Sequence, residues 1–325
     1  MDKKLLRLCL ALLLVLAVLA LLDAGCGLIP VSLSHLVTGT LTAQEQAVIY
    51  FIRMPRFVFG AAAGAALSLS GAVLQGVFGN PLADPGILGV SGGACLGAVL
   101  ALLSGFCLQY AFLLPLGAFI GALAAIAAVN LLGRRSGEAH GGDTVLLLGG
   151  VAIGLFCGAL TSGLLSFAPP QIMQQYFFWT LGTLSGSSWR QLPLLPVMAI
   201  FMMILMLLGR PLNLLSLGEE QALAAGLDVF VWRRRILLLV SFLTALAVCL
   251  VGNISFVGLI VPHLTRRFTG PDHRMLLPAS AVMGAVILVA CDFAGRVLFP
   301  FGELRTGIVT ALLGAPYFLF LLRRH

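Results

Sequence analysis

Residues that could carry ions or protons are few within the apolar stretches of this 325-residue sequence. Asp292 lies near the end of one apolar run, and His263 follows Pro262 in a shorter one, while the other acids fall in loops or at the ends of runs. Ionisable side chains inside a membrane segment are the usual mark of ion or proton coupling. Packing or capping explains His263 better than proton transfer does. Sodium coupling through backbone carbonyls leaves no such mark and stays open.

Residue types that support catalysis or metal binding do not form clusters. The seven cysteines show no CxxC or other metal-ligand spacing. The phosphate-binding loop of an ATPase needs a lysine, and the two lysines of the chain are Lys3 and Lys4. We therefore expect no catalytic site, no metal site and no cofactor bound by this chain. Any ATP hydrolysis must occur on a separate subunit.

The composition places the chain in a membrane. Hydrophobic residues make up 60% and charged residues 10% of the chain, and the mean hydropathy is +1.08. Soluble domains contain about 45–50% apolar residues and about 25% charged residues. The apolar runs are much longer than barrel strands of ~10 residues. The net charge of +7 comes from short basic clusters between apolar runs, which is typical of topology signals rather than nucleic-acid binding. The sequence predicts an all-α polytopic membrane protein.

Ten apolar runs are candidate transmembrane helices, and the eighth is too short to cross a bilayer alone. They span residues 5–22, 57–78, 87–104, 110–132, 144–167, 192–208, 236–252, 256–268, 275–294 and 306–322. Cytoplasmic loops of membrane proteins are enriched in Lys and Arg. With a cytoplasmic N-terminus, only five of the nineteen Lys and Arg residues face outside, namely Arg53, Arg56, Arg190, Arg296 and Arg305. We therefore expect both termini in the cytoplasm.

The first apolar run has two readings. Basic residues precede it and "DAGC" follows it, ending at Cys26, which is similar to a lipoprotein signal. Asp23, however, stands where such signals carry an aliphatic residue. Retaining the segment as a first helix also keeps the topology consistent, so we predict a retained span rather than a cleaved signal.

The stretch "FGNPLADPGILGVSGG" (78–93) interrupts the apolar pattern. Pro81 and Pro85 lack backbone N–H groups and disfavour helical geometry in the residues before them. Asp84 can cap the helix that follows. We predict a cytoplasmic turn between the second and third helices. The helix before it carries small residues at i, i+4 spacing, a pattern for close packing in lipid.

A similar break occurs in the second half of the chain. "GNPLADPGILG" (79–89) and "GNISFVGLIVPH" (252–263) both interrupt an apolar run after Gly-Asn. The two are offset by five helices, so the second copy would be inverted in the membrane. We predict a weak inverted repeat that relates helices 2–5 to helices 7–10, a transporter feature.

The longest cytoplasmic insert reads "LNLLSLGEEQALAAGLDVFVWRRR" (212–235) and is too polar to span a bilayer. Glu219 and Glu220 suit the start of a short helix, and Gly226 suits its end. The residues alone leave two readings open. The insert is either a surface helix among lipid headgroups or a docking feature for a separate ATPase.

Four motifs give the chain a family resemblance from about residue 50 to its C-terminus. They are "RMPRFVFGAAAGAALSLSGAVLQGVFGNPLADPGILGVSGGA" (53–94), "LSLGEEQALAAGL" (215–227), "GNISFVGLIVPHLTRRFTGPDHRMLLP" (252–278) and "ELRTGIVTALLGAPYFLFLL" (303–322). The sequence resembles the FecCD-type permeases, which are membrane subunits of type II ABC importers for iron–siderophore complexes, haem and vitamin B12.

The resemblance implies one transmembrane permease domain over residues 1–325, with a coupling-helix insert at about 212–232. It implies a second permease copy or a paralogue, two ABC ATPases that use ATP and Mg, and an extracytoplasmic substrate-binding protein. The expected location is the cytoplasmic membrane of a bacterium or archaeon. Transport would proceed by alternating access driven by the ATPases.

The resemblance also assigns roles to residues at the two membrane faces. Glu219, Ala222 and Gly226 match coupling-helix positions, with Glu220 beside them, and Ala225 stands where relatives often have leucine. On the outer face, "RMPR" and "DFAGR" match places where permeases offer arginines to glutamates of the binding protein. Those arginines are Arg53, Arg56 and Arg296.

The resemblance places a gate and a pathway between the two faces. Asp143 and Thr144 match a cytoplasmic gate, although capping of a helix by Asp143 explains that residue equally well. Pathways in the family are lined largely by the fifth and tenth helices. In this sequence the corresponding small and hydroxyl residues are Thr161, Ser162, Thr306, Thr310 and Gly314.

The sequence thus predicts the permease subunit of an importer for a ferric siderophore, haem or cobalamin. The alternative is a self-sufficient, ion-coupled secondary transporter, whose uptake would follow an ion gradient and ignore ATP depletion. Which chelate is carried does not follow from this sequence, because specificity in such systems resides mostly in the soluble binding protein.

Overall fold

The computed structural model describes residues 3–27, 31–32, 35, 38–110, 112–135, 142–298 and 302–323, without the side chains of 87, 108, 133–135, 142–147 and 322. Its longer helices are α1 (Lys3–Gly25), α4 (Met54–Val77), α5 (Val90–Leu103), α6 (Leu113–Arg135), α7 (Gly142–Ser166), α8 (Pro170–Thr180), α9 (Leu194–Leu207), α12 (Val229–Val251), α13 (Val257–Thr269), α14 (His273–Val297) and α15 (Thr306–Leu322). Short helices are α3 (Ala43–Val48), α10 (Gly209–Leu215) and α11 (Glu219–Ala224), with single turns η1 (Ile49–Arg53), η2 (Pro85–Leu88), η3 (Phe106–Leu108) and η4 (Trp189–Gln191).

Each of the ten predicted helices corresponds to an observed one. The ends agree within three residues, except that α12 begins seven residues before the predicted start at 236. Six of the described helices are long and apolar enough to cross a membrane, and α9 with α10, bent by 51°, makes a seventh. Helix α8 was not predicted, because its sequence "PQIMQQYFFWT" mixes polar and aromatic residues and is too short for a span.

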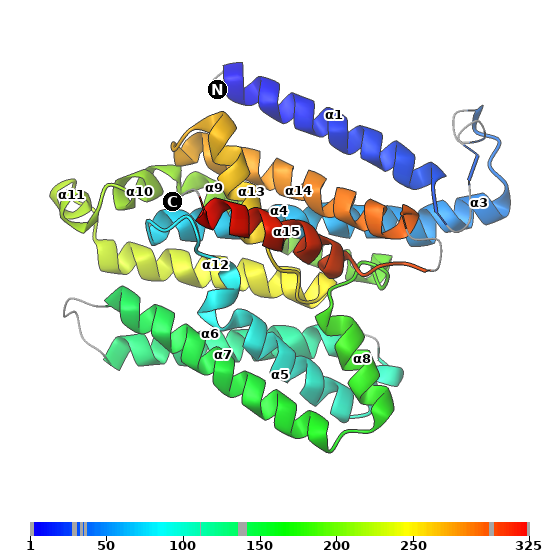
Figure 1. Cartoon of the computed structure of the whole chain (residues 1–325), viewed down its shortest axis with the longest axis horizontal. Coiled ribbons are helices and arrows are strands. Elements are labelled where there is room, and N and C mark those ends of the chain that lie inside the picture. The colour runs from blue at the N-terminus through cyan, green and yellow to red at the C-terminus, as the bar shows by residue number, and fades with distance from the viewer. Residues whose placement is uncertain are drawn as a thin grey trace.

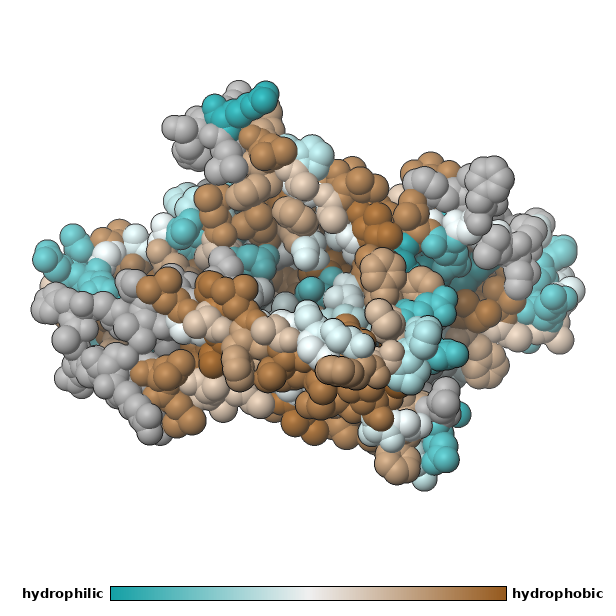
Figure 2. All heavy atoms as spheres, turned by 60° about the horizontal axis from the view of Figure 1, so that its bottom comes forward, coloured by the Kyte–Doolittle hydropathy of each residue, from teal (hydrophilic) through white to brown (hydrophobic). Residues whose placement is uncertain are grey.

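The long helices run roughly side by side, so the bundle has two ends (Figure 1). One end carries α11, the start of α1 and the end of α15, and is called the α11 end below. The opposite end carries α3 and α8 and is called the α3 end. Apolar side chains cover much of the face over α5, α6 and α7, as expected for a surface that contacts lipid or another membrane helix (Figure 2).

Helix α4 lies at the centre of the larger group of helices and packs against α12, α13 and α14. It approaches two of them at backbone distance, because Gly64 faces Gly284 of α14 and Gly71 faces Gly258 of α13. The Ser68 hydroxyl donates to the Ser280 carbonyl at 2.8 Å across the same interface. Small residues therefore allow the close packing that the i, i+4 pattern predicts.

A second group consists of α5, α6 and α7. Glycines again set the spacing, because Gly97 of α5 faces the backbone of Gly117 in α6. Helix α12 contacts both α4 and α6 and so joins the two groups. By contrast, α1 is largely exposed, with 11% of its span buried, and it packs mainly on α14.

The stretch 78–93 is not the simple cytoplasmic turn that the sequence predicts. After α4 the chain folds back into the bundle, and Pro85 comes against Gly258 at the start of α13. Asp84 accepts a hydrogen bond from the Gly86 N–H at 2.8 Å, so it caps the turn η2, while α5 itself begins after Gly89 with φ +77°. The prediction was wrong about depth, because it could not include the partner that receives Pro85.

A substitution in α4 tests the backbone contact. We expect Gly71→Ala to lower the stability of the purified protein by about 1–3 kcal/mol, because the new methyl group would overlap the Gly258 carbonyl. Gly158→Ala in α7 is the matched control, since nothing lies within 4 Å of its added Cβ. Thermal unfolding in detergent measures both. Equal midpoints for Gly71→Ala and wild type would contradict the packing.

Candidate functional site

A buried ion network lies at the α3 end and connects α4 to α14. The Arg56 guanidinium donates to both oxygens of Asp292, from Nε at 2.8 Å and from Nη2 at 3.0 Å. Its Nη1 donates to Glu303 at 2.8 Å. Such a two-pronged pair fixes geometry as well as charge. Arg56 is placed there at the start of α4, directly after Pro55, which lacks a backbone donor and follows the widened turn η1.

The network extends to α1 and α15. Arg296 pairs with Asp23 of α1, and its Nε lies 3.3 Å from Asp292. The Thr306 hydroxyl, in the first turn of α15, donates to Asp292 at 2.7 Å. Arg53 donates to the Ala24 carbonyl. Asp292 is therefore held from three sides, and α1 is part of the same structure.

The three arginines predicted to dock a binding protein are not exposed. Arg53, Arg56 and Arg296 have exposed fractions of 4%, 5% and 8%. All three lie at the α3 end of the bundle, and their side chains are buried there. Burial is possible because two of them meet carboxylates of the same chain, which offset the cost of removing charge from water. Their docking role stays a prediction.

The predicted pathway residues fall into three environments. Thr310 and Gly314 of α15 line a cavity of about 260 Å³, together with Phe256 and Tyr317. Thr161 and Ser162 lie on α7, outside that cavity; Thr161 is buried and the Ser162 hydroxyl donates to the Gly158 carbonyl.

Thr306 is fully buried, and its hydroxyl donates to Asp292 and so ties the start of α15 to α14. Its place on the pathway stays a prediction. Three other residues that the sequence singles out lie in α13 and α7. His263 packs edge-on against Tyr317, as a packing residue would. Asp143 and Thr144 belong to the first turn of α7, but their side chains lie outside the described residues.

The insert at the α11 end has the predicted local structure. Helix α11 begins at Glu219, and Gly226 follows it with φ +82°, a left-handed conformation that favours glycine. Glu219 and Glu220 are exposed, whereas Ala222 is fully buried and anchors the helix to the bundle. Arg233 of α12 donates to Glu219 at 2.6 Å. Ala222 therefore packs against the bundle, and its coupling role, like those of Glu219, Glu220 and Gly226, stays a prediction.

Side-chain hydrogen bonds tie the insert to the membrane helices. The Asn213 amide in α10 donates to Asp272 at 2.7 Å, and its oxygen accepts from the His273 N–H at 2.9 Å. The hydrogen bond from Asn213 and one from the Arg274 N–H lower the pKa of Asp272. Through Asn213, α10 is connected to the first turn of α14.

Sequence reasoning missed the carboxylates that complete these sites. Asp23 was considered only as a feature of a signal peptide, and Glu303 lies in a loop that gives no local signal. Asp84 was assigned to a surface turn but lies inside the bundle. An acid at the end of an apolar run, opposite an arginine at the end of another, is the only hint that the sequence contains.

Comparison with known proteins identifies the architecture. The model of the FecCD transport family matches residues 12–324. This chain belongs to the FecCD transport family. Among curated relatives, it is 44% identical to the cobalamin import system permease protein BtuC of Halobacterium salinarum over 86% of this chain and 74% of that protein. It is 40% identical to the hemin transport system permease protein HmuU of Yersinia pestis over 97% and 94% of the two chains.

A solved structure agrees with this FecCD assignment. The chain is similar to a metal-chelate type ABC transporter in an inward-facing conformation, with a TM-score of 0.88 and 33% identity. The match covers 98% of this chain and 99% of that one. The family, the all-helical fold and the order of the helices therefore agree with the resemblance found in the four motifs.

The ion network predicts the effect of a conservative substitution. Asp292→Asn keeps the shape of the side chain but removes one of the three carboxylates of the network, so the three buried arginines keep only Asp23 and Glu303 as negative partners. Removing one partner of a buried pair costs about 3–5 kcal/mol, so we expect a much lower unfolding temperature. Arg190→Gln, an exposed change at the same end, is the control and should unfold like wild type. A wild-type midpoint for Asp292→Asn would show that the network is not structural.

Proposed function

We propose that the chain is the permease subunit of an ABC importer that carries a metal chelate across a cytoplasmic membrane. The match to the FecCD family over residues 12–324 is the observation that carries this proposal. Relatives named as permeases for cobalamin and for hemin support cobalamin, haem or a similar chelate such as a ferric siderophore as the substrate. The chain performs no catalysis in this role.

We infer that ATP is hydrolysed, with Mg, by two partner ATPases that dock at the α11 end. The exposed acids of α11 and the exposed side chains of Leu217 and Leu223, at 63% and 59%, offer a mixed polar and apolar contact surface. This end also carries most of the basic clusters, including Arg233–Arg235, which favours a cytoplasmic location by the positive-inside rule. Both termini would then be cytoplasmic.

A second permease copy or a paralogue would complete the path. Helix α7 buries only 17% of its span, and Leu155 and Phe156 on it are 70% and 61% exposed. On α15, Leu312 and Leu313 are similarly exposed. Two subunits that face each other with α7 and α15 would bring Thr161, Ser162, Thr310 and Gly314 toward one pathway. Weakly polar walls of this kind let a bulky chelate pass without binding it tightly.

The α3 end would face outside and receive the substrate-binding protein. In the closed network the three arginines are balanced by Asp23, Asp292 and Glu303, so this patch offers little net positive charge to an acidic partner. Glu303 is the outermost acid, with a side chain 34% exposed. Docking through Arg56 would therefore require its bond to Glu303 to be exchanged for a bond to the binding protein.

Glu303→Gln tests this exchange. Removing the competing charge leaves Arg56 attractive to a partner carboxylate, so we expect a several-fold lower Kd for the binding protein, with a faster association rate at low salt. Glu45→Gln removes an acid at the same end that contacts His35 and Thr42 instead of the arginines, and it controls for net charge. Equal affinities of the two variants for the binding protein would show that Arg56 does not take part in docking.

Gly226→Pro tests the coupling insert. Proline fixes φ near −65°, which is incompatible with φ +82° at Gly226, and it removes the N–H that donates to Leu223. We expect ATP hydrolysis to continue while substrate uptake falls at least tenfold. The control is Gly105→Pro, which has φ +75° and loses an equivalent N–H bond at the α3 end. Normal uptake by Gly226→Pro would refute the coupling role.

The proposal as a whole is tested by isolating the tagged chain gently from native membranes and identifying what accompanies it. We expect an ATPase subunit to co-purify. The absorption spectrum of the binding protein from the same system should then show a haem, a corrinoid or a ferric chelate. A chain that is isolated alone under conditions that preserve known ABC complexes would oppose the importer assignment.

A further inference from the structure

A polar cavity of about 220 Å³ lies inside the bundle where the two interrupted segments of the chain meet. Asp84, Pro85 and Gly86 come from the segment between α4 and α5, and residues 253–255 come from the segment between α12 and α13. Leu67 lies ten residues before the end of α4, so the cavity is about 15 Å from the α11 end, at 1.5 Å per helical residue. This depth lies within the membrane-spanning part of the bundle.

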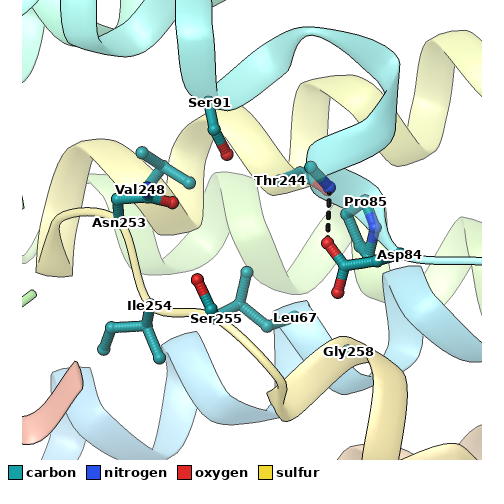
Figure 3. Close-up of a pocket in the computed structure, with 11 residues that line it drawn as sticks. Leu67, Asp84, Pro85, Ser91, Thr244, Val248, Asn253, Ile254, Ser255 and Gly258 are labelled. Atoms are coloured by element: carbon teal, nitrogen blue, oxygen red, sulfur yellow. Dashed lines mark hydrogen bonds between the residues drawn. The ribbon is translucent and has the colours of Figure 1, made fainter. Parts of the chain in front are cut away.

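Oxygen-bearing side chains from four parts of the fold line this cavity. They are Asp84, Ser91 of α5, Thr244 of α12, and Asn253 and Ser255. Asp84, Ser91 and Ser255 point toward a common space (Figure 3). Oxygen ligands of this type suit hard cations, and unwound segments between helices supply such sites in transporters.

Asp84 brings a negative charge to this site. One of its oxygens accepts the Gly86 N–H, and none of the eleven described residues that line the cavity is basic. A carboxylate at this depth is costly unless a positive charge or a proton balances it. The end of α12 and the start of α13 both lie beside the cavity. The C-terminal end of α12 brings a partial negative charge, whereas the N-terminal ends of α13 and of α5, whose Ser91 lines the cavity, bring partial positive charges. Asp84 carries the only full charge among the described residues that line the cavity.

We propose that this cavity binds one alkali cation, Na⁺ or K⁺, between Asp84 and the surrounding hydroxyl and amide oxygens. A single carboxylate balances a single positive charge, whereas a divalent ion would leave one charge uncompensated in a medium of low dielectric constant. A volume of about 220 Å³ also accommodates several waters at ~30 Å³ each, so the cation keeps part of its hydration. The ion holds the two interrupted segments together.

Direct binding tests the site. The permease, isolated in lipid nanodiscs with any subunits that accompany it, is titrated with ²²Na⁺ and with ⁸⁶Rb⁺ as a K⁺ analogue. We expect saturable binding of at least one ion with a stoichiometry of one per chain, and the preferred isotope distinguishes a sodium site from a potassium site. Absence of saturable binding of both ions by the wild-type protein would overturn the proposal.

Variants assign the binding to this cavity. Asp84→Asn keeps an oxygen that can accept the Gly86 N–H but removes the charge, and we expect at least a tenfold loss of affinity. Ser255→Ala should weaken binding several-fold. Asp228→Asn is the matched control, because Asp228 is an exposed acid that caps α12 at its Val231 N–H, and it should bind like wild type. Wild-type affinity in Asp84→Asn would place the ion elsewhere and refute the assignment.

A stability measurement covers the case in which Asp84→Asn does not fold. An ion that binds only the folded state raises the unfolding temperature with its concentration. We expect the wild-type midpoint to rise with NaCl or KCl relative to N-methyl-D-glucamine chloride at equal ionic strength. A midpoint that depends on ionic strength alone would contradict a specific site. Failure here leaves the importer assignment intact, because co-purification with an ATPase tests that separately.

Discussion

The rest of the structure depends on the close contact of α4 with α13 and α14. Glycines at positions 64 and 71 bring the α4 backbone against Gly284 and Gly258. Because this contact fixes the position of α4, it also places residues of α4 at three depths of the bundle. At the α3 end Arg56 meets Asp292, at mid-depth Leu67 lines the polar cavity, and toward the α11 end Gln75 donates to the Leu259 carbonyl at 3.0 Å. A shift of α4 would therefore change both ends and the interior together.

The features that the sequence predicts correctly are local. Apolar run length determines the ten helices, and Glu219 with Gly226 determines the limits of α11. Features that need a distant partner were not predictable from the pattern. Arg56 and Asp292 are 236 residues apart, so nothing near Arg56 indicates that it is buried. For the same reason, the sequence around Pro85 predicts a surface turn, because the interior residue that it contacts, Gly258, is distant in the sequence.

The two ends of the bundle differ in how tightly their polar residues are held within the chain. The α3 end is closed by a balanced ion network that ties α1, α4, α14 and the start of α15 together, so a partner there must compete with internal pairs. The α11 end presents an exposed short helix that packs on the bundle through Ala222 and pairs with Arg233 of α12 through Glu219. Through α10 and Asn213 it is also linked to α14. Force applied to that helix would therefore reach the membrane helices through a short, hydrogen-bonded connection.

Reconstituted transport tests the central claim most directly. The permease would be placed in proteoliposomes with its ATPase and binding protein, and uptake of labelled cobalamin or haem would be measured with ATP or with an imposed ion gradient as the only energy source. Importer function predicts uptake that requires ATP on the ATPase side and continues when ion gradients are collapsed. Uptake that follows the ion gradient without ATP would contradict it and would favour a secondary transporter.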